Sequence, residues 1–166
     1  MATANSKNFT LQIDGFLRKV DANVDAIIRK VIIDVAKRII YRSPVGQREL
    51  WAINVERKKK GLPGLLPKGY VGGRFRANWQ YGNDTIGIPV QPIDAVDPSG
   101  GQTMAGIVSS VPVSKLAGMR HLITNNLPYA QRLEDGWSKQ APVGMVGVTV
   151  REFSGMVENA AKEVNK

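Results

Sequence analysis

The sequence predicts an α+β domain, in which a small antiparallel sheet packs with a long N-terminal helix and a C-terminal helix. Three observations predict this class: a long helical periodicity near the N-terminus, several short apolar runs separated by turn residues, and a second helical periodicity near the C-terminus. The 166 residues fit one domain, residues 1–166, and are enough to bury a core without metals or disulfides. Residues 1–13 are expected to form a flexible N-terminal arm.

Residues 15–41 predict the long helix, with Asp14 as its N-cap. The Ser43–Pro44 pair ends it, because proline lacks an amide donor and disfavours the helical state in the preceding residue. Further isoleucines lie off the main apolar face, so the helix is expected to bury two faces, either both within the chain or one against a neighbouring subunit. The main face comprises Phe16, Val20, Val24, Ile27, Ile28, Val31, Val35 and Ile39.

A connector rich in glycine, proline and basic residues follows the helix, and residues 47–72 are predicted to be an inserted loop. Loops of this length without structure of their own are uncommon in compact domains and tend to be functional or disordered. Its basic side chains are candidates for contact with DNA phosphates or with a protein partner. These candidates are Arg57, Lys58, Lys59, Lys60 and Lys68. Of the aromatic residues around the loop, Phe75 and Trp79 are expected to pack the sheet instead of stacking on bases.

Short apolar runs between turn residues predict the strands of the sheet. These runs cover residues 75–81, 86–90, 104–111 and 122–125, and residues 97–101 carry a strong turn signal. Residues 129–135 predict a short helical turn that ends at Gly136. Residues 142–164 predict the C-terminal helix, although residues 146–150 alternate as a strand would.

The net charge of +9 is concentrated in the first half of the chain. Residues 18–76 hold 15 of the 23 Lys and Arg but 5 of the 14 Asp and Glu, which gives +10 there and −1 elsewhere. Such asymmetry favours contact with a polyanion or an acidic protein, and the alternative is a solvated basic face. Residues 1–10 are polar and no apolar run approaches the roughly 20 residues that cross a bilayer, so no membrane partner is expected.

No constellation of catalytic residues can be assembled from the sequence. There is no cysteine, which excludes thiolate zinc sites and cysteine nucleophiles, and His121 is the single histidine. Glu134 and Asp135 are adjacent and would point in different directions on a helix, so Glu134 is expected to face Arg132 or a basic partner. Asp94 and Asp97 lie in a segment of turns. The sequence therefore predicts a protein that is not an enzyme and that uses no cofactor.

Three segments carry motifs in a fixed order along the chain. Residues 42–46 read RSPVG directly after the long helix, residues 72–79 read GGRFRANW, and residues 124–136 read TNNLPYAQRLEDG. Together they resemble the HK97 gp10-like family of bacteriophage tail-completion and neck proteins, and the resemblance covers most of the chain from about residue 15. The motif positions are Ser43, Pro44, Gly73, Arg74, Trp79, Asn126, Pro128, Tyr129, Ala130, Glu134 and Gly136.

For these motif positions we expect structural roles. Pro128 and Tyr129 would form a tight corner between strand and helix, with the Tyr129 ring buried against the long helix, and Gly136 would take a positive φ. The sequence departs from the family pattern at residues 47–72, because many relatives continue from Ser-Pro-Val directly into Asp-Thr-Gly-Arg. A role for the basic insert is therefore an inference from this chain alone.

The resemblance implies a virion structural protein, made in the host bacterial cytoplasm, that forms a ring at the head–tail junction around the DNA channel. Its expected partners are further copies of itself, in a hexamer or alternatively a dodecamer, the head–tail connector, and the tail terminator or tail tube proteins. Nonspecific contact with DNA in the channel is also expected. The alternatives are a nonspecific DNA-binding protein and, within the virion, a tail terminator or minor tail component.

Overall fold

The computed structural model describes residues 3–65 and 70–165. Its α+β architecture confirms the predicted class: a long N-terminal helix and a C-terminal helix pack with a small antiparallel sheet. The elements are α1 (Thr3–Arg42), the 3-10 turn η1 (Arg48–Leu50), α2 (Ala52–Lys59), α3 (Arg74–Ala77), β1 (Trp79–Asn83), α4 (Gly101–Ser110), β2 (His121–Asn125), α5 (Ala130–Glu134), α6 (Val146–Arg151) and α7 (Phe153–Val164).

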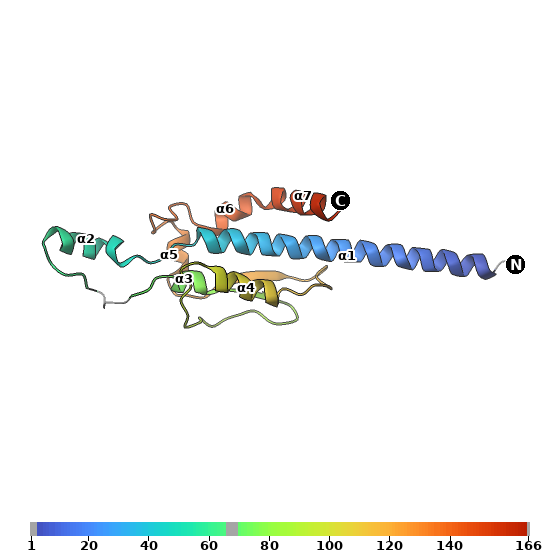
Figure 1. Ribbon diagram of the computed structural model, residues 1–166, viewed down its shortest axis with the longest axis horizontal. Coiled ribbons are helices and arrows are strands. Elements are labelled where there is room, and N and C mark those ends of the chain that lie inside the picture. The colour runs from blue at the N-terminus through green and yellow to red at the C-terminus, as the bar shows by residue number, and fades with distance from the viewer. Residues whose placement is uncertain (1–2, 66–69, 166) are drawn as a thin grey trace.

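Helix α1 is the axis of the molecule (Figure 1). Helices α6 and α7 lie along one side of it, and the two strands lie on the other side together with α3 and α4. The strands pair antiparallel, with Trp79 opposite Asn125 and Asn83 opposite His121. The N-terminal part of α1 extends past the other elements at one end of the molecule, and α2 projects at the opposite end.

The core gathers around the C-terminal half of α1. Its members come from α1, from the sheet and the helical turn before it, from α4, and from the loops on either side of β2, and they expose less than a tenth of their surface. Apolar burial of this kind supplies the main stabilising free energy of the fold. The central residues are Ile32, Ala36, Ile39, Ile40, Phe75, Trp79, Tyr81, Ile107, Leu116 and Met145.

The long helix ends at Arg42, as the Ser43–Pro44 pair predicts, but its start was predicted wrongly. It begins at Thr3, so Asp14 lies inside the helix and is not its N-cap, and the described residues of the expected N-terminal arm are helical. The segment contains no proline, and a single glycine inside a helix costs only about 1 kcal/mol relative to alanine. Gly15 was therefore too weak a signal to mark the start of the helix.

Residues 101–110 form α4, so the strand predicted over residues 104–111 is wrong. Met104, Ile107 and Val111 place apolar side chains at helical spacing toward the core. The carboxylate of Asp97 accepts hydrogen bonds from the backbone N–H groups of Gly100 and Thr103, at 2.8 Å each. These bonds satisfy donors that the start of a helix leaves free, and this stabilises helix over strand.

The other predictions are confirmed in part. The strand over residues 122–125 and the helical turn before Gly136 are present, and residues 146–150 are helical. The C-terminal helix begins at Val146 instead of residue 142 and is divided into α6 and α7 at Glu152. The first predicted strand is split, because α3 occupies its beginning and β1 starts at Trp79. In place of the strand predicted over residues 86–90 there is an isolated bridge between Asn83 and Gly87. The predicted basic loop contains η1 and α2.

Gly73 occupies a position that a residue with a side chain cannot take without strain. Its φ is +106°, and a Cβ there would lie 2.5 Å from the backbone nitrogen of Pro98. We predict that Gly73→Ala lowers the free energy of unfolding by more than about 2 kcal/mol, measured by urea denaturation. Gly106→Ala is the matched control: it lies inside α4 with open space at its Cβ, so the same change should stabilise slightly. Equal effects at the two positions would contradict this account.

Candidate functional site

Two of the motif segments meet at Ser43, which is almost fully buried. The Ser43 hydroxyl donates to the backbone oxygen of Ile39 at 2.8 Å and accepts a hydrogen bond from Trp79 Nε1 at 2.7 Å. The backbone oxygen of Ser43 accepts a second bond, from Arg76 Nη2, also at 2.7 Å. Residues from the end of α1 are thereby joined to the α3–β1 segment. Pro44 is buried beside this junction.

Arg76 holds the same junction from the side of α3. Its guanidinium also donates to the backbone oxygen of Pro98 at 2.6 Å. Burial lowers the pKa of Arg76, an effect that the nearby Asp97 carboxylate opposes. The neighbouring motif residue Arg74 is exposed and lies 3.8 Å from Asp94 in a surface ion pair. Arg76 is therefore a structural clamp that the motif positions chosen from the sequence did not include.

The third motif segment is tied to the second through asparagine side chains. Asn125 Nδ2 donates to the backbone oxygen of Phe75 at 2.8 Å, and Asn126 Nδ2 donates to that of Pro89 at 2.8 Å. The expected burial of Tyr129 against α1 is wrong: the ring lies against Phe75 at 6.1 Å between centroids and is 38% exposed. The buried residue of this corner is Leu127, since Pro128 is exposed. Ala130 begins α5 and packs against the edge of the core.

Glu134 has a different role from the one predicted. Its carboxylate accepts hydrogen bonds from three successive backbone N–H groups, those of Met145, Val146 and Gly147, at 2.9, 3.0 and 2.9 Å. Burial alone would raise the pKa of Glu134, but the three hydrogen bonds outweigh it and lower the pKa. Arg132, the expected partner, instead lies over the ring of Trp137. Glu134 therefore fixes the start of α6.

The expected positive φ at Gly136 is confirmed, with a value of +84°. A Cβ at this position would clash with the backbone oxygen of Pro142. The turn after α5 thus brings the chain close to the segment that precedes α6, the helix that Glu134 caps.

His121, the first residue of β2, is held at both ring nitrogens. Nε2 lies 3.0 Å from the backbone oxygen of Leu116, and Nδ1 lies 2.9 Å from the hydroxyl of Tyr81. Because a carbonyl can only accept, the neutral ring that donates from Nε2 accepts at Nδ1 from Tyr81. Within residues 3–65 and 70–165, no three His, Asp or Glu side chains gather as metal ligands would. His121 is best explained as part of the packing between β2 and the loop before it.

Residues 48–65 of the predicted basic loop contain η1 and α2, and we call this segment the basic arm. Asn54 is buried at its centre, where Nδ2 donates to the backbone oxygen of Arg48 and Oδ1 accepts from the N–H of Leu65. Arg57 donates to the backbone oxygen of Pro63 at 2.7 Å, and Lys59 pairs with Glu56 at 2.9 Å. Two members of the basic run are thus engaged within the arm itself.

Lys58 and Lys60 are exposed, and neither forms an ion pair with any of the residues described here. Lys68 lies outside the described residues. Trp51 and Tyr70 pack edge to face, with ring centroids 5.6 Å apart, and both remain partly exposed. The prediction that Phe75 and Trp79 pack the core is confirmed. Of the predicted phosphate-contacting residues that the structure describes, Lys58 and Lys60 thus remain exposed and outside the contacts that hold the arm together.

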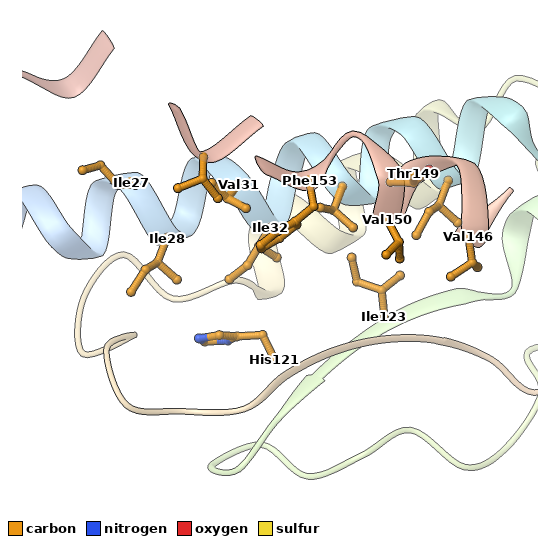
Figure 2. Close-up of a pocket in the computed structure, with 13 residues that line it drawn as sticks. Ile27, Ile28, Val31, Ile32, His121, Ile123, Val146, Thr149, Val150 and Phe153 are labelled. Carbon is orange, nitrogen blue, oxygen red and sulfur yellow. The ribbon is translucent and has the colours of Figure 1, made fainter. Parts of the chain in front are cut away.

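An apolar groove of about 490 Å³ lies between α1, β2 and the α6–α7 pair (Figure 2). The groove is not among the features that the sequence predicts, although the second apolar face expected on the long helix is a signal for it. Its polar members, His121 and Thr149, are both engaged in hydrogen bonds within the chain. It is lined by Ile27, Ile28, Val31, Ile32, Val35, Ile39, His121, Ile123, Val146, Thr149, Val150, Phe153 and Val157.

Comparisons of this chain with models of known protein families, with curated proteins and with solved structures find no match. None of the described helices is long and apolar enough to cross a membrane.

Loss of the Ser43 hydroxyl leaves the buried Trp79 indole N–H without its acceptor. We predict that Ser43→Ala lowers the free energy of unfolding by about 1–3 kcal/mol, the cost of an unsatisfied buried donor. Chemical denaturation followed by Trp fluorescence measures it. Ser154→Ala removes the same group from an exposed position of α7 and should change stability by less than about 0.5 kcal/mol. A loss confined to Ser154→Ala would contradict the proposed junction.

Glu134→Gln is predicted to lower the free energy of unfolding by about 1–2 kcal/mol at pH 7, because the α6 N–H groups lose a charged acceptor. The pKa of Glu134 is lowered in the folded protein, so its contribution is present above the unfolded pKa and is lost as the pH falls through the folded pKa. The difference between the variant and the parent should therefore vanish in acid. Asp135→Asn, an adjacent exposed carboxylate, is the matched control and should show little effect at either pH.

Proposed function

We propose that this chain is a virion structural protein of a tailed bacteriophage, a neck or tail-completion subunit. In this proposal it forms a ring at the head–tail junction around the DNA channel. Its neighbours are further copies of itself, the head–tail connector on one side, and the tail terminator or tail tube on the other. The proposal rests on the resemblance of three ordered segments to the HK97 gp10-like family, together with one observation from the fold.

That observation is how the three segments meet. The first and second are joined where Trp79 donates to Ser43, and the second and third where Asn125 donates to the backbone of Phe75. Residues far apart in the sequence therefore act as one framework, which supports treating them as a shared structural motif and not as three chance matches. The motif residues Glu134 and Ser43 take part in hydrogen bonds at the start of α6 and at the end of α1, which supports a structural role for the motif.

The shape of the molecule suits a ring. A closed ring needs two different contact surfaces on each subunit, so that one subunit's first surface meets the next subunit's second. The free part of α1 and the basic arm project at opposite ends of the molecule (Figure 1), and an apolar groove lies between α1, β2 and the α6–α7 pair (Figure 2). These features offer more than one surface for neighbours, while the exposed Lys58 and Lys60 provide a basic tip for nonspecific contact with DNA.

A discrete oligomer is the expected outcome for the purified protein. Light scattering across protein concentration should find a closed ring, with a hexamer expected first and a dodecamer second, and electron microscopy should show a central channel. A monomer at every concentration that also fails to assemble on added connector or tail tube protein would contradict the proposal.

The second candidate function is a nonspecific DNA-binding protein, and the basic arm is the observation that favours it. Replacing Lys58, Lys59 and Lys60 together with Gln removes up to three contacts to phosphates. For duplex DNA, each such contact contributes about −0.9 to the slope of the logarithm of the binding constant against the logarithm of the salt concentration. For a neck subunit we predict weak binding of duplex DNA by the parent protein at physiological salt, with ring formation unchanged in the variant. Binding is measured by fluorescence anisotropy across a salt series.

The matched control neutralises Lys115, Lys139 and Lys162, three exposed lysines outside the arm, and so changes the net charge equally. Tight, salt-sensitive binding by the monomer that is lost in the arm variant and kept in the control would favour the DNA-binding protein instead.

A further inference from the structure

The N-terminal part of α1 carries an apolar stripe that the described chain does not cover. Helix α7 ends beside Asn23, whose side chain donates to Asn165 at 3.4 Å, and α1 continues beyond this point (Figure 1). Leu17, Val20 and Val24 are 52%, 39% and 37% exposed, and their spacing of three and four residues places them on one face. We call these three residues the α1 stripe. A helix in water is held mainly by packing of its apolar face, so an uncovered stripe implies a missing partner.

The α1 stripe lies on the same face of the helix as the floor of the apolar groove. Continuing its spacing of three and four residues from Val24 leads to Ile27 and Val31, which line the groove. A repeat of this kind is the pattern by which one helix packs along another. One face of α1 is thus covered within the chain over its C-terminal half and uncovered over its N-terminal half.

The groove itself is open to solvent along its α6–α7 wall. Val150, Phe153 and Val157 are 65%, 48% and 36% exposed although they line an apolar recess. Figure 2 shows Val150 and Phe153 beside Val31, Ile32 and Ile123 around a common space. Such an open apolar recess suits an apolar side-chain row of a helix more than it suits a polar ligand.

The chain cannot fill its own groove with its own stripe. The stripe and the α1 side of the groove belong to one continuous helix, and a straight helix cannot fold back on itself without a break. Each additional copy, however, supplies one stripe and one groove in equal number. Charge favours the same pairing: Arg18 and Lys19 are exposed beside the stripe, and Glu158 is exposed on α7 next to Val157.

We propose that the apolar groove of one copy binds the α1 stripe, residues Leu17, Val20 and Val24, of a second copy of this chain. This inference deepens the self-assembly part of the proposed function and rests on it. In this proposal α1 has two roles: its C-terminal half packs in the core of its own subunit, and its N-terminal half binds the groove of the neighbouring subunit.

Because the sequence contains no cysteine, single introduced cysteines can test the contact directly. The Val20→Cys and Val157→Cys proteins carry tags of different length, so that their crosslinked products can be told apart by size. The two proteins are mixed, incubated so that subunits exchange between oligomers, and treated with a short bismaleimide crosslinker. We expect a mixed crosslinked dimer, formed at least tenfold more than between Val20→Cys and Val90→Cys. Val90 is the matched control, since it is an exposed valine that lies outside both surfaces. A mixed product no more abundant than this control would overturn the proposal.

Introducing negative charge into the α1 stripe provides a second test of the contact. Val20→Asp combined with Val24→Asp should weaken self-association at least tenfold in light scattering, with the circular dichroism spectrum kept, because both residues are partly exposed and lie at or beyond the edge of the core. Val90→Asp combined with Val113→Asp places the same charges on two other exposed valines and should leave the association unchanged. An oligomer unaffected by the stripe variant would also overturn the proposal.

The outcomes separate this contact from the proposed function. A ring in which the Val20→Cys and Val157→Cys proteins form no mixed crosslink would remove the contact and leave the neck proposal standing. A closed dimer that gives this mixed crosslink would confirm the contact and contradict the ring. A monomer at all concentrations would overturn the contact.

Discussion

The fold depends on the buried junction at the end of α1, where Ser43 accepts a hydrogen bond from Trp79 and its backbone oxygen accepts one from Arg76. A helix end leaves backbone groups without partners, and burial makes each unpaired group costly. Here side chains from the α3–β1 segment supply hydrogen-bond partners at the helix end. The same contacts therefore terminate the helix and position the sheet against it. The Trp79 ring then packs edge to face on Phe75 and carries the junction into the core. The core residues on α1 keep their places because this end of the helix is fixed.

At three other places, a carboxylate accepts backbone N–H groups where a loop approaches a helix. Asp97 accepts hydrogen bonds at the start of α4, and Glu134 does so at the start of α6. Asp25 on α1 accepts the backbone N–H groups of Lys115, Leu116 and Ala117, which lowers the pKa of its carboxyl group. Each carboxylate gathers several donors, and a charged acceptor makes each of these hydrogen bonds stronger than a neutral one. The acidic residues of this basic protein thus hold the fold together, while much of its positive charge remains at the surface.

The difference between residues that stabilise the fold and residues that remain exposed is relevant to function. Several motif residues, among them Ser43, Trp79 and Glu134, are engaged in contacts within the molecule, so the motif segments on which the proposed function rests belong mainly to the framework of the fold. The surfaces left for partners are elsewhere: the basic arm, the free part of α1 and the apolar groove. The proposed contact pairs an apolar stripe on α1 with the apolar groove between α1, β2 and the α6–α7 pair, and each copy would supply both surfaces. The proposed ring and the proposed contact follow from that pairing, and the arm remains available for DNA or for a further protein.

The sequence by itself determined the class of the fold, the end of the long helix at Arg42, the strand at residues 122–125 and the positive φ of Gly136, because periodicity, proline and glycine act locally. It did not determine α4, the role of Glu134 or the burial of Tyr129, since each depends on a partner distant in the chain. The basic run was visible in the sequence, but only the structure showed that Arg57 and Lys59 are engaged within the arm. The groove was decided by tertiary packing alone, because a recess exists only between elements and no local pattern specifies the space that they leave.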